Sequence, residues 1–178
     1  MKFFIGIIPP ESYLHKIQRF QRQWENNRIV EVVEPHITVK AQGGLTSDQE
    51  WLKKVEKVCK QIPSFTLSLG EPQFFGKQVL FLSVEDSKVY KLHRLLVEAV
   101  SPSDDLIKRY MEMEQYHPHL TLGQTHWGLT SDELVQMEQV ARDKLTPYPE
   151  WTVNFIRIYQ EIEENTYQPY KDIPLLNL

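Results

Sequence analysis

The chain has 178 residues, 41% of them hydrophobic, so it can bury a core of its own without disulfide bridges. Its formal net charge of -4 argues against a broad surface that binds long nucleic acid by neutralising phosphates, although a few local donors suffice for one phosphate. The single cysteine, Cys59, excludes an intrachain disulfide and is typical of a reducing compartment. No stretch resembles a signal peptide or approaches the roughly 18 apolar residues that cross a bilayer, so we expect a cytoplasmic protein without membrane contact.

The first half of the chain predicts strands and amphipathic helices in alternation. Short apolar runs that end at Pro or Gly are typical of buried strands, whereas apolar residues that recur every three or four positions indicate one face of a helix. In order, we expect a buried strand at residues 2–8, a helix at 11–24, an extended piece at 29–33, a strand from His36, a helix that opens on Thr46-Ser47-Asp48-Gln49-Glu50 and continues to Ile62, and a half-exposed strand at 65–69.

The second half predicts the same kinds of element. After a loop that contains Pro72 and Gly76, we expect a strand at 79–84 that pairs with the strand at 65–69. There follow a helix at 87–100, a polar loop at 104–116, a strand from His119, a helix from about 128 to 144, a long strand at 151–162 and a strand at 166–173 that returns antiparallel to it.

Two tetrapeptides place a histidine two positions before a threonine. They are His36-Ile37-Thr38-Val39 and His119-Leu120-Thr121-Leu122. Alternate side chains of a strand share a face, so each His and its Thr point one way while the aliphatic residues point into a core. Each copy therefore offers one imidazole and one hydroxyl together.

A longer repeat surrounds these tetrapeptides. Gly44-Leu45-Thr46-Ser47-Asp48 begins eight residues after His36, and the identical Gly128-Leu129-Thr130-Ser131-Asp132 begins nine residues after His119. Each copy of this pentapeptide resembles the start of a helix. The recurrence of a strand, a Gly break and a helix start predicts two related halves.

We therefore expect an α+β fold in a single bilobal domain over residues 1–178. Its internal repeats would span approximately 2–70 and 79–160, with a further C-terminal strand at 166–173. Mostly antiparallel sheets would form a central groove with helices on the outside, and an approximate two-fold axis would place the two His-x-Thr strands on either side of that groove.

The chemistry of the two motifs points to proton transfer. Imidazole has an unperturbed pKa near neutrality, so one of His36 and His119 can accept a proton while the other donates one. The hydroxyls of Thr38 and Thr121 can donate to non-bridging phosphate oxygens and hold the charge that develops on phosphorus.

At these residues the sequence resembles the two-histidine (2H) phosphoesterase superfamily, which includes bacterial 2′-5′ RNA ligases and RNA 2′,3′-cyclic phosphodiesterases. The resemblance implies a bilobal α+β fold with an internal repeat, with His36 and His119 as acid and base and Thr38 and Thr121 as the phosphate-binding residues. It also implies a phosphodiesterase that needs neither a metal nor a cofactor and whose partner is a nucleotide or an oligoribonucleotide end. The oligomeric state stays open, as does which histidine is the acid.

The chain departs from the ligase-type members after each motif. An aromatic residue commonly follows the first motif in those members, whereas Lys40-Ala41-Gln42 follows it here, and Gly123-Gln124 follows the second. These endings are closer to a small bacterial subgroup of uncertain substrate. The sequence therefore predicts a phosphoesterase without fixing its substrate or the direction of its reaction.

Several other residues are candidates for substrate contact. Because side chains alternate along a strand, Lys40 should lie on the same face as His36. There it either adds charge at the phosphate or is a solvated lysine at the end of the strand. His117 shares the parity of His119, and aromatic residues in loops can stack on a base; these are Phe74, Phe75, Tyr116 and Trp127. The remaining histidines, His15, His93 and His126, have no partner motif and are expected at the surface or at helix caps.

Three alternatives remain beside the phosphoesterase. The groove could bind an RNA end or nucleotide without turnover. His36, His117 and His119 could ligate a metal ion, although no Cys or carboxylate motif accompanies them. An acyl-transfer hydrolase is disfavoured because the sequence has no Gly-x-Ser-x-Gly nucleophile elbow.

Overall fold

The computed structural model describes residues 1–177 as an α+β fold, as the sequence predicts. The first half contains β1 (Phe3–Ile7), α1 (Glu11–Gln21), β2 (Ile37–Lys40), α2 (Leu52–Cys59) and β3 (Phe65–Ser68). The second half contains β4 (Pro72–Phe75), β5 (Val79–Ser83), α3 (Ser87–Val100), α4 (Asp104–Arg109), β6 (His119–Gln124), α5 (Ser131–Lys144), β7 (Glu150–Val153), β8 (Phe155–Glu163) and β9 (Thr166–Pro174). Three short 3-10 helices lie in the connections, at Arg28–Glu31, Met113–Gln115 and Thr125–Trp127.

The two histidine strands are neighbours in the middle of a seven-stranded sheet. Its order is β4-β5-β6-β2-β1-β8-β9, and every neighbouring pair in it is antiparallel. The pairing of β2 with β6 consists of one residue pair, Ile37 with Leu120. β3 and β7 form a separate two-stranded antiparallel sheet.

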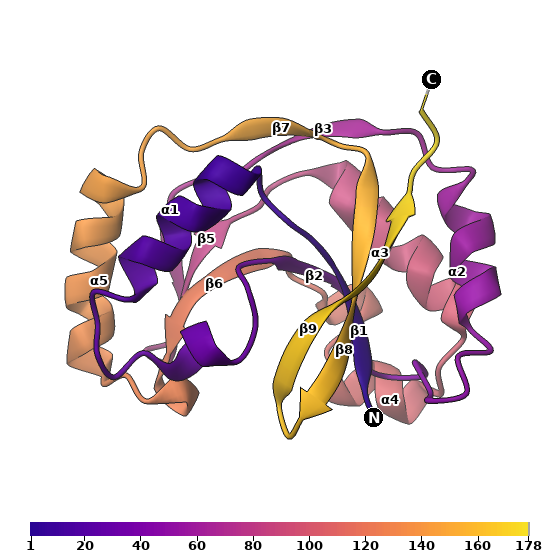
Figure 1. The fold of residues 1–178 in the computed structure, drawn as a ribbon, viewed down its shortest axis with the longest axis horizontal. Helices are drawn as coiled ribbons and strands as arrows, with labels where there is room; N and C mark the ends of the chain where they lie inside the picture. Colours follow the sequence, from indigo (N-terminus) through magenta and orange to yellow (C-terminus); the bar gives the residue numbers. More distant parts are fainter. Residues whose placement is uncertain (178) are drawn as a thin grey trace.

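Four of the α-helices lie in two groups at opposite ends of the molecule (Figure 1), α1 with α5 and α2 with α3. The Tyr13 hydroxyl of α1 donates to the Leu145 carbonyl after α5 at 2.7 Å, and Lys16 donates to the Thr146 carbonyl at 3.1 Å. Each group therefore combines one helix from each sequence repeat. β3 and β7 combine strands of the two repeats in the same way.

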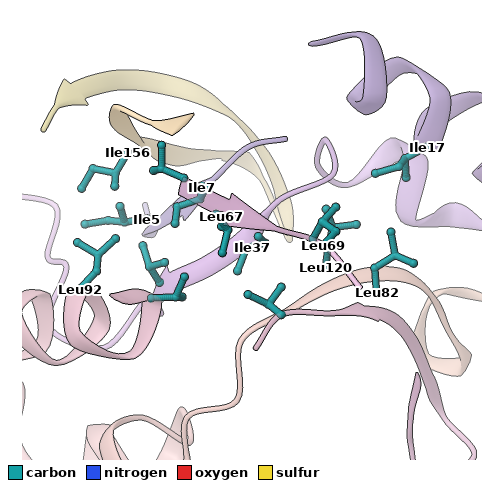
Figure 2. Close-up of a cluster of buried hydrophobic side chains, with 14 of the residues drawn as sticks. Ile5, Ile7, Ile17, Ile37, Leu67, Leu69, Leu82, Leu92, Leu120 and Ile156 are labelled. Carbon is teal, nitrogen blue, oxygen red and sulfur yellow. The ribbon is translucent and has the colours of Figure 1, made fainter. Parts of the chain in front are cut away.

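The apolar faces of these elements form a continuous core (Figure 2). Ile5, Ile37, Leu120 and Ile156 come from four strands of the large sheet, and each is completely buried. Burying such a side chain stabilises the fold by about 1.5–3 kcal/mol. Ile37 and Leu120 are the aliphatic residues inside the two His-x-Thr motifs. Their burial in the core therefore fixes the position of both motifs.

Three predicted elements differ from the observed ones. The extended piece at 29–33 is largely the 3-10 helix Arg28–Glu31. The loop expected around Pro72 contains strand β4, which pairs with β5, so the strand at 65–69 pairs with β7 rather than with 79–84. Pro72 can begin this strand because β4 lies at the edge of the sheet, where a missing N–H costs no ladder bond.

Two further differences concern the second half. The long strand expected at 151–162 is divided at Asn154 into β7 and β8, which belong to different sheets. The polar loop at 104–116 contains α4, whose start is capped because the Ser103 hydroxyl accepts from the Leu106 N–H at 3.4 Å. The predicted helix at 87–100 and the return strand at 166–173 are confirmed.

The repeated pentapeptide starts a helix in one half only. Thr130 and Glu133 form a capping box at the start of α5. In the first half the Asp48 carboxylate instead accepts from the Thr46 hydroxyl at 2.6 Å and from the Glu50 N–H at 3.1 Å, which closes a turn. Gln49, the residue that would complete the box, has a φ of 58°, so the predicted helix start at Thr46 is wrong and α2 begins at Leu52.

Among residues 1–177, no helix is both long enough and apolar enough to cross a membrane.

Candidate active site

Both histidine strands carry a bulge at the same place, directly after the threonine. The residue pairs on either side of the bulge are Ile5 with Lys40 and Gly6 with Thr38 in the first half, and Leu80 with Gly123 and Phe81 with Thr121 in the second. Val39 and Leu122 are the extra residues. A bulge puts two residues opposite one and ends the simple alternation of side chains. The His and Thr of each motif thus share a face, whereas residues beyond the threonine do not follow that parity.

The carbonyl of each bulged residue accepts hydrogen bonds from side chains of the other repeat. His93 of α3 donates from Nδ1 to the Val39 carbonyl at 2.8 Å. Gln21 and Asn27 donate to the Leu122 carbonyl at 3.3 and 3.2 Å. Because a bulge leaves backbone groups outside the ladder, these donors satisfy polar groups that would otherwise be buried and unpaired.

The two motif histidines are anchored identically. Nδ1 of His36 lies 2.8 Å from the carbonyl of Glu34, and Nδ1 of His119 lies 2.7 Å from the carbonyl of His117. A carbonyl only accepts, so this bond assigns the proton of each neutral ring to Nδ1. In both halves Nε2 is left as the atom that can accept or donate a proton at the site.

Around His36 the walls are aromatic. The ring of Phe4 lies 4.8 Å from the His36 ring, and that of Tyr159 lies 5.5 Å away. The Glu34 carboxylate accepts from the Tyr159 hydroxyl at 2.8 Å and from Arg157 at 2.9 Å, which fixes the residue whose carbonyl holds the imidazole. Burial lowers the pKa of His36 to about 4, against the opposing effect of the Glu34 carbonyl.

His119 lies among different neighbours. The ring of Phe75 meets it edge to face at 4.9 Å, and Phe81 lies 5.4 Å away. Phe75 also contacts the ring of His117 at 5.0 Å. Burial lowers the pKa of His119 as well; the His117 carbonyl opposes this shift, and the charge of the His117 side chain adds to it.

Each histidine lines its own cavity, and the two cavities share a boundary. His119 lines a cavity of about 630 Å³ and His36 lines one of about 250 Å³. The residues common to both cavities are Thr38, Gln42, Thr121 and Gln124. The four residues that the motifs single out therefore line two adjoining cavities, with neutral hydroxyl and amide groups at their shared boundary.

The other proposed contacts are distributed unevenly. Phe75, Tyr116 and His117 line the larger cavity, and Trp127 lines the smaller one. Phe74 lines neither of these two cavities and is 36% exposed, because the alternation along β4 turns it away from Phe75.

Lys40 is neither solvated nor free. It is fully buried, and its Nζ lies 2.8 Å from a carboxylate oxygen of the equally buried Glu112. Burial lowers the pKa of Lys40 and raises that of Glu112, and each partner opposes the shift of the other. Parity fails for Lys40 because the bulge at Val39 lies between it and the His face.

The expectation that His93 lies at the surface or at a cap is wrong. The residue is 2% exposed, its Nε2 accepts from the Met113 N–H at 2.9 Å, and its ring stacks on Tyr116 at 3.7 Å. Burial lowers its pKa to about 4, and Lys40 and Arg94 lower it further. His15 and His126 are exposed, as expected.

Gln42 and Gln124 are the site residues that the sequence reasoning missed. By simple alternation Gln124 would face away from His119, but the bulge brings it to the cavity. Gly123 was the available signal, since an isolated Gly within a strand often marks a bulge. Gln42 donates to the Tyr167 hydroxyl at 3.4 Å, a contact between distant segments that no local pattern reveals.

The three histidines His36, His117 and His119 do not form a metal-binding cluster. Within the described part of the chain, residues 1–177, no group of three or more His, Cys, Asp or Glu side chains is arranged to hold a metal ion.

These observations define an α+β protein in which two matching strands each present a histidine and a threonine to one pair of adjoining cavities. A family model described as the 2′-5′ RNA ligase superfamily matches residues 8–165, so the chain belongs to this superfamily of phosphoesterases and ligases. The resemblance to the two-histidine phosphoesterases is thereby confirmed. No curated protein matches the chain.

Solved structures share the fold across the whole chain. LigT of E. coli complexed with NADP+ superposes with a TM-score of 0.63 at 19% identity, covering 98% of this chain and 97% of that one. LigT complexed with 3′-AMP gives 0.62 at 19%, covering 98% of each chain. The protein TT0787 of Thermus thermophilus gives 0.68 at 16%, covering 99% of each. At these identities the likeness is one of fold.

Proposed function

We propose that the protein is a metal-independent phosphoesterase that acts on the 2′,3′-cyclic phosphate or 2′-5′ phosphodiester of RNA or nucleotides. His36 and His119 are the catalytic pair, and Thr38 and Thr121 bind the phosphate. The observation that carries this proposal is the matched Nδ1 anchoring of the two imidazoles, which reserves both Nε2 atoms for adjoining cavities that share both threonines.

The environments of the two histidines suggest their roles. The pKa of His36 is about 4, so this imidazole is neutral at pH 7 and suited to accept a proton from water or a ribose hydroxyl. His119 then donates a proton to the leaving oxygen. A bound phosphate supplies the negative charge that favours the protonated form of this second imidazole.

The phosphate is held by neutral donors in this proposal. The hydroxyls of Thr38 and Thr121 and the amides of Gln42 and Gln124 lie between the two cavities. Donors fixed in advance can stabilise the charge that develops on phosphorus without rearranging during the reaction. Such a site suits the single negative charge of a phosphodiester.

The cavities support a nucleotide as substrate. The larger volume, about 630 Å³, lies within the range of about 300–1,000 Å³ that is usual for small-molecule sites. Its aromatic wall residues Phe75, Tyr110 and Tyr116 offer faces on which a base can stack. Structures of LigT with 3′-AMP and with ATP agree with a nucleotide at this fold.

A panel of 2′,3′-cyclic nucleotides and 2′-5′-linked dinucleotides, assayed with excess EDTA, tests the proposal. We expect turnover of at least one substrate in EDTA and none with the double variant H36A/H119A. Binding of the same compounds without product would instead support the nucleotide-binding module. Activity that EDTA abolishes would contradict the metal-independent mechanism.

A further inference from the structure

A buried ion pair joins the strand of the first histidine to the segment that leads into the second. The side chains of Lys40 and Glu112 are 0% and 2% exposed, and Nζ lies 2.8 Å from Oε1. Lys40 ends β2, the strand of Thr38, whereas Glu112 lies seven residues before His119. The pair therefore connects the two halves of the site.

Every proton of the Lys40 ammonium is matched by an oxygen. Besides the Glu112 carboxylate, it donates to the Ala41 carbonyl at 2.8 Å and the Gly43 carbonyl at 2.7 Å. An ammonium group has three N–H donors and no acceptor, so this arrangement matches the charged form. The other carboxylate oxygen of Glu112 accepts from the Ala41 N–H at 3.3 Å. The pair thus fixes the backbone just beyond the bulge.

The segment that carries Glu112 is itself in an unusual conformation. Met111 and Met113, on either side of it, have φ angles of 53° and 59°, which non-glycine residues adopt rarely. Such backbone persists where the surrounding contacts hold it in place. Here the contacts are the ion pair, the His93 bond to the Met113 N–H and the Tyr116 hydroxyl, which donates to the Thr38 carbonyl at 2.8 Å.

Backbone pairing in the sheet contributes little to the spacing between the two motifs, so side-chain contacts must fix it. β2 and β6 are paired only at Ile37 and Leu120, so no further ladder pair ties Thr38 to Thr121. We propose that the Lys40–Glu112 ion pair is a positioning device that sets the first histidine motif at a fixed spacing from the second. Rates are sensitive to such spacing, because a misplacement of about 1 Å can cost about 10²-fold.

The decisive variant is K40M/E112L. Either single change leaves one buried charge without its partner, so K40M and E112L should each lower the melting temperature strongly. Replacing both with apolar residues of similar size should recover the fold. We expect kcat of the recovered double variant to remain about tenfold or more below wild type, with KM changed less, when both are measured below every melting temperature.

The exposed pair Arg94–Glu114 provides the matched control. It joins α3 to the same segment with an N–O distance of 3.1 Å, and its side chains are 51% and 86% exposed. R94M/E114L removes this pair without disturbing a buried charge. Its kcat and KM should equal those of the wild type, because exposed ion pairs contribute little to structure.

The kinetic test rests on the proposed function, so NMR of the His36 and His119 side-chain nitrogens gives a readout that does not need turnover. We expect the nitrogen resonances of both imidazoles to shift in K40M/E112L and those of neither to shift in R94M/E114L.

If the wild type turns over no diester, the proposed function fails, while the NMR comparison still decides this inference. Should K40M/E112L not fold, K40M/E112Q replaces it, because it also removes both charges and retains the size of Glu112 and an oxygen acceptor for the Ala41 N–H. Wild-type kcat and unshifted imidazoles in the folded variant would overturn the inference.

Discussion

The two halves of the site share their imidazole geometry and differ in what surrounds it. In each half a carbonyl two residues before the histidine holds Nδ1, and a bulge follows the threonine. Pro35 and Pro118 occupy the same position before each histidine, and Pro biases the preceding residue toward extended backbone. Local sequence therefore accounts for the orientation of each ring.

The surroundings of the two bulges use different chemistry. The Val39 carbonyl is held by a titratable group, His93, whereas the Leu122 carbonyl is held by two neutral amides. Beyond the bulge, Lys40 enters a buried ion pair, whereas Gly123 faces Leu129 of the α5 region. The comparison teaches that one imidazole geometry can rest on a charged support in one half and on a neutral, close-packed one in the other.

The largest expected effect comes from removing either imidazole. H36A and H119A should each lower kcat by about 10²–10⁴-fold on a diester substrate, the usual contribution of a general acid or base. In profiles of kcat/KM against pH, H36A should lose the acidic limb and H119A the alkaline limb. A loss of less than tenfold in one variant alone would break the equivalence of the two halves. Circular dichroism of both variants checks that the fold is intact.

Acid should destabilise the half supported by His93. The folded-state pKa of His93 is about 4 and its unfolded value is about 6.5, so the unfolded chain binds more protons between these pH values. Stability is therefore fully present above pH 6.5 and falls as the pH drops toward 4, by up to about 3 kcal/mol from this group.

The variant H93Q sharpens this contrast, because it places an amide where the other half already uses Gln21. Urea unfolding at several pH values should give a shallower loss of stability between pH 6.5 and 4 than in the wild type. Part of the pH dependence of stability should remain in H93Q, because the pKa of His36 is also about 4. An unchanged slope in H93Q would show that His93 is not the titrating support.

The neutral half should be more sensitive to added volume. A Cβ at Gly123 would lie 2.5 Å from Cδ1 of Leu129 and 3.1 Å from the sulfur of Met137. G123A should therefore lower the free energy of unfolding by about 1–3 kcal/mol, the usual cost of overpacking. A loss below about 0.5 kcal/mol by urea unfolding would mean that α5 moves aside freely and that the packing is not close.

Much of this fold follows from local patterns. The helix at 87–100 matches its predicted range because Asp86 caps its start and its apolar residues keep a helical period. The identical pentapeptides diverged because the turn around Asp48 competes with the capping box, and the sequence of the pentapeptide cannot decide between them.

In the candidate site, the sequence predicts the face of each side chain only as far as the bulge. His36, Thr38, His119 and Thr121 precede it, so the alternation of strand side chains assigns their common face. Beyond it, parity misplaces Lys40, and the buried roles of Glu112 and His93 depend on contacts between distant segments. Tertiary packing determines register shifts and polar contacts between distant segments. The alternation of side chains along a strand carries no information about either.

The smallest predicted effect concerns the residues whose carbonyls hold the imidazoles. The Glu34 carboxylate raises the pKa of His36, so E34Q should lower that pKa further. His117 lowers the pKa of His119, so H117Q should raise it. NMR titration should show pKa shifts of opposite sign, at His36 in E34Q and at His119 in H117Q. Because backbone carbonyls remain in both variants, the Nδ1 anchors persist, and a change in tautomer would contradict the assignment of those anchors to the main chain.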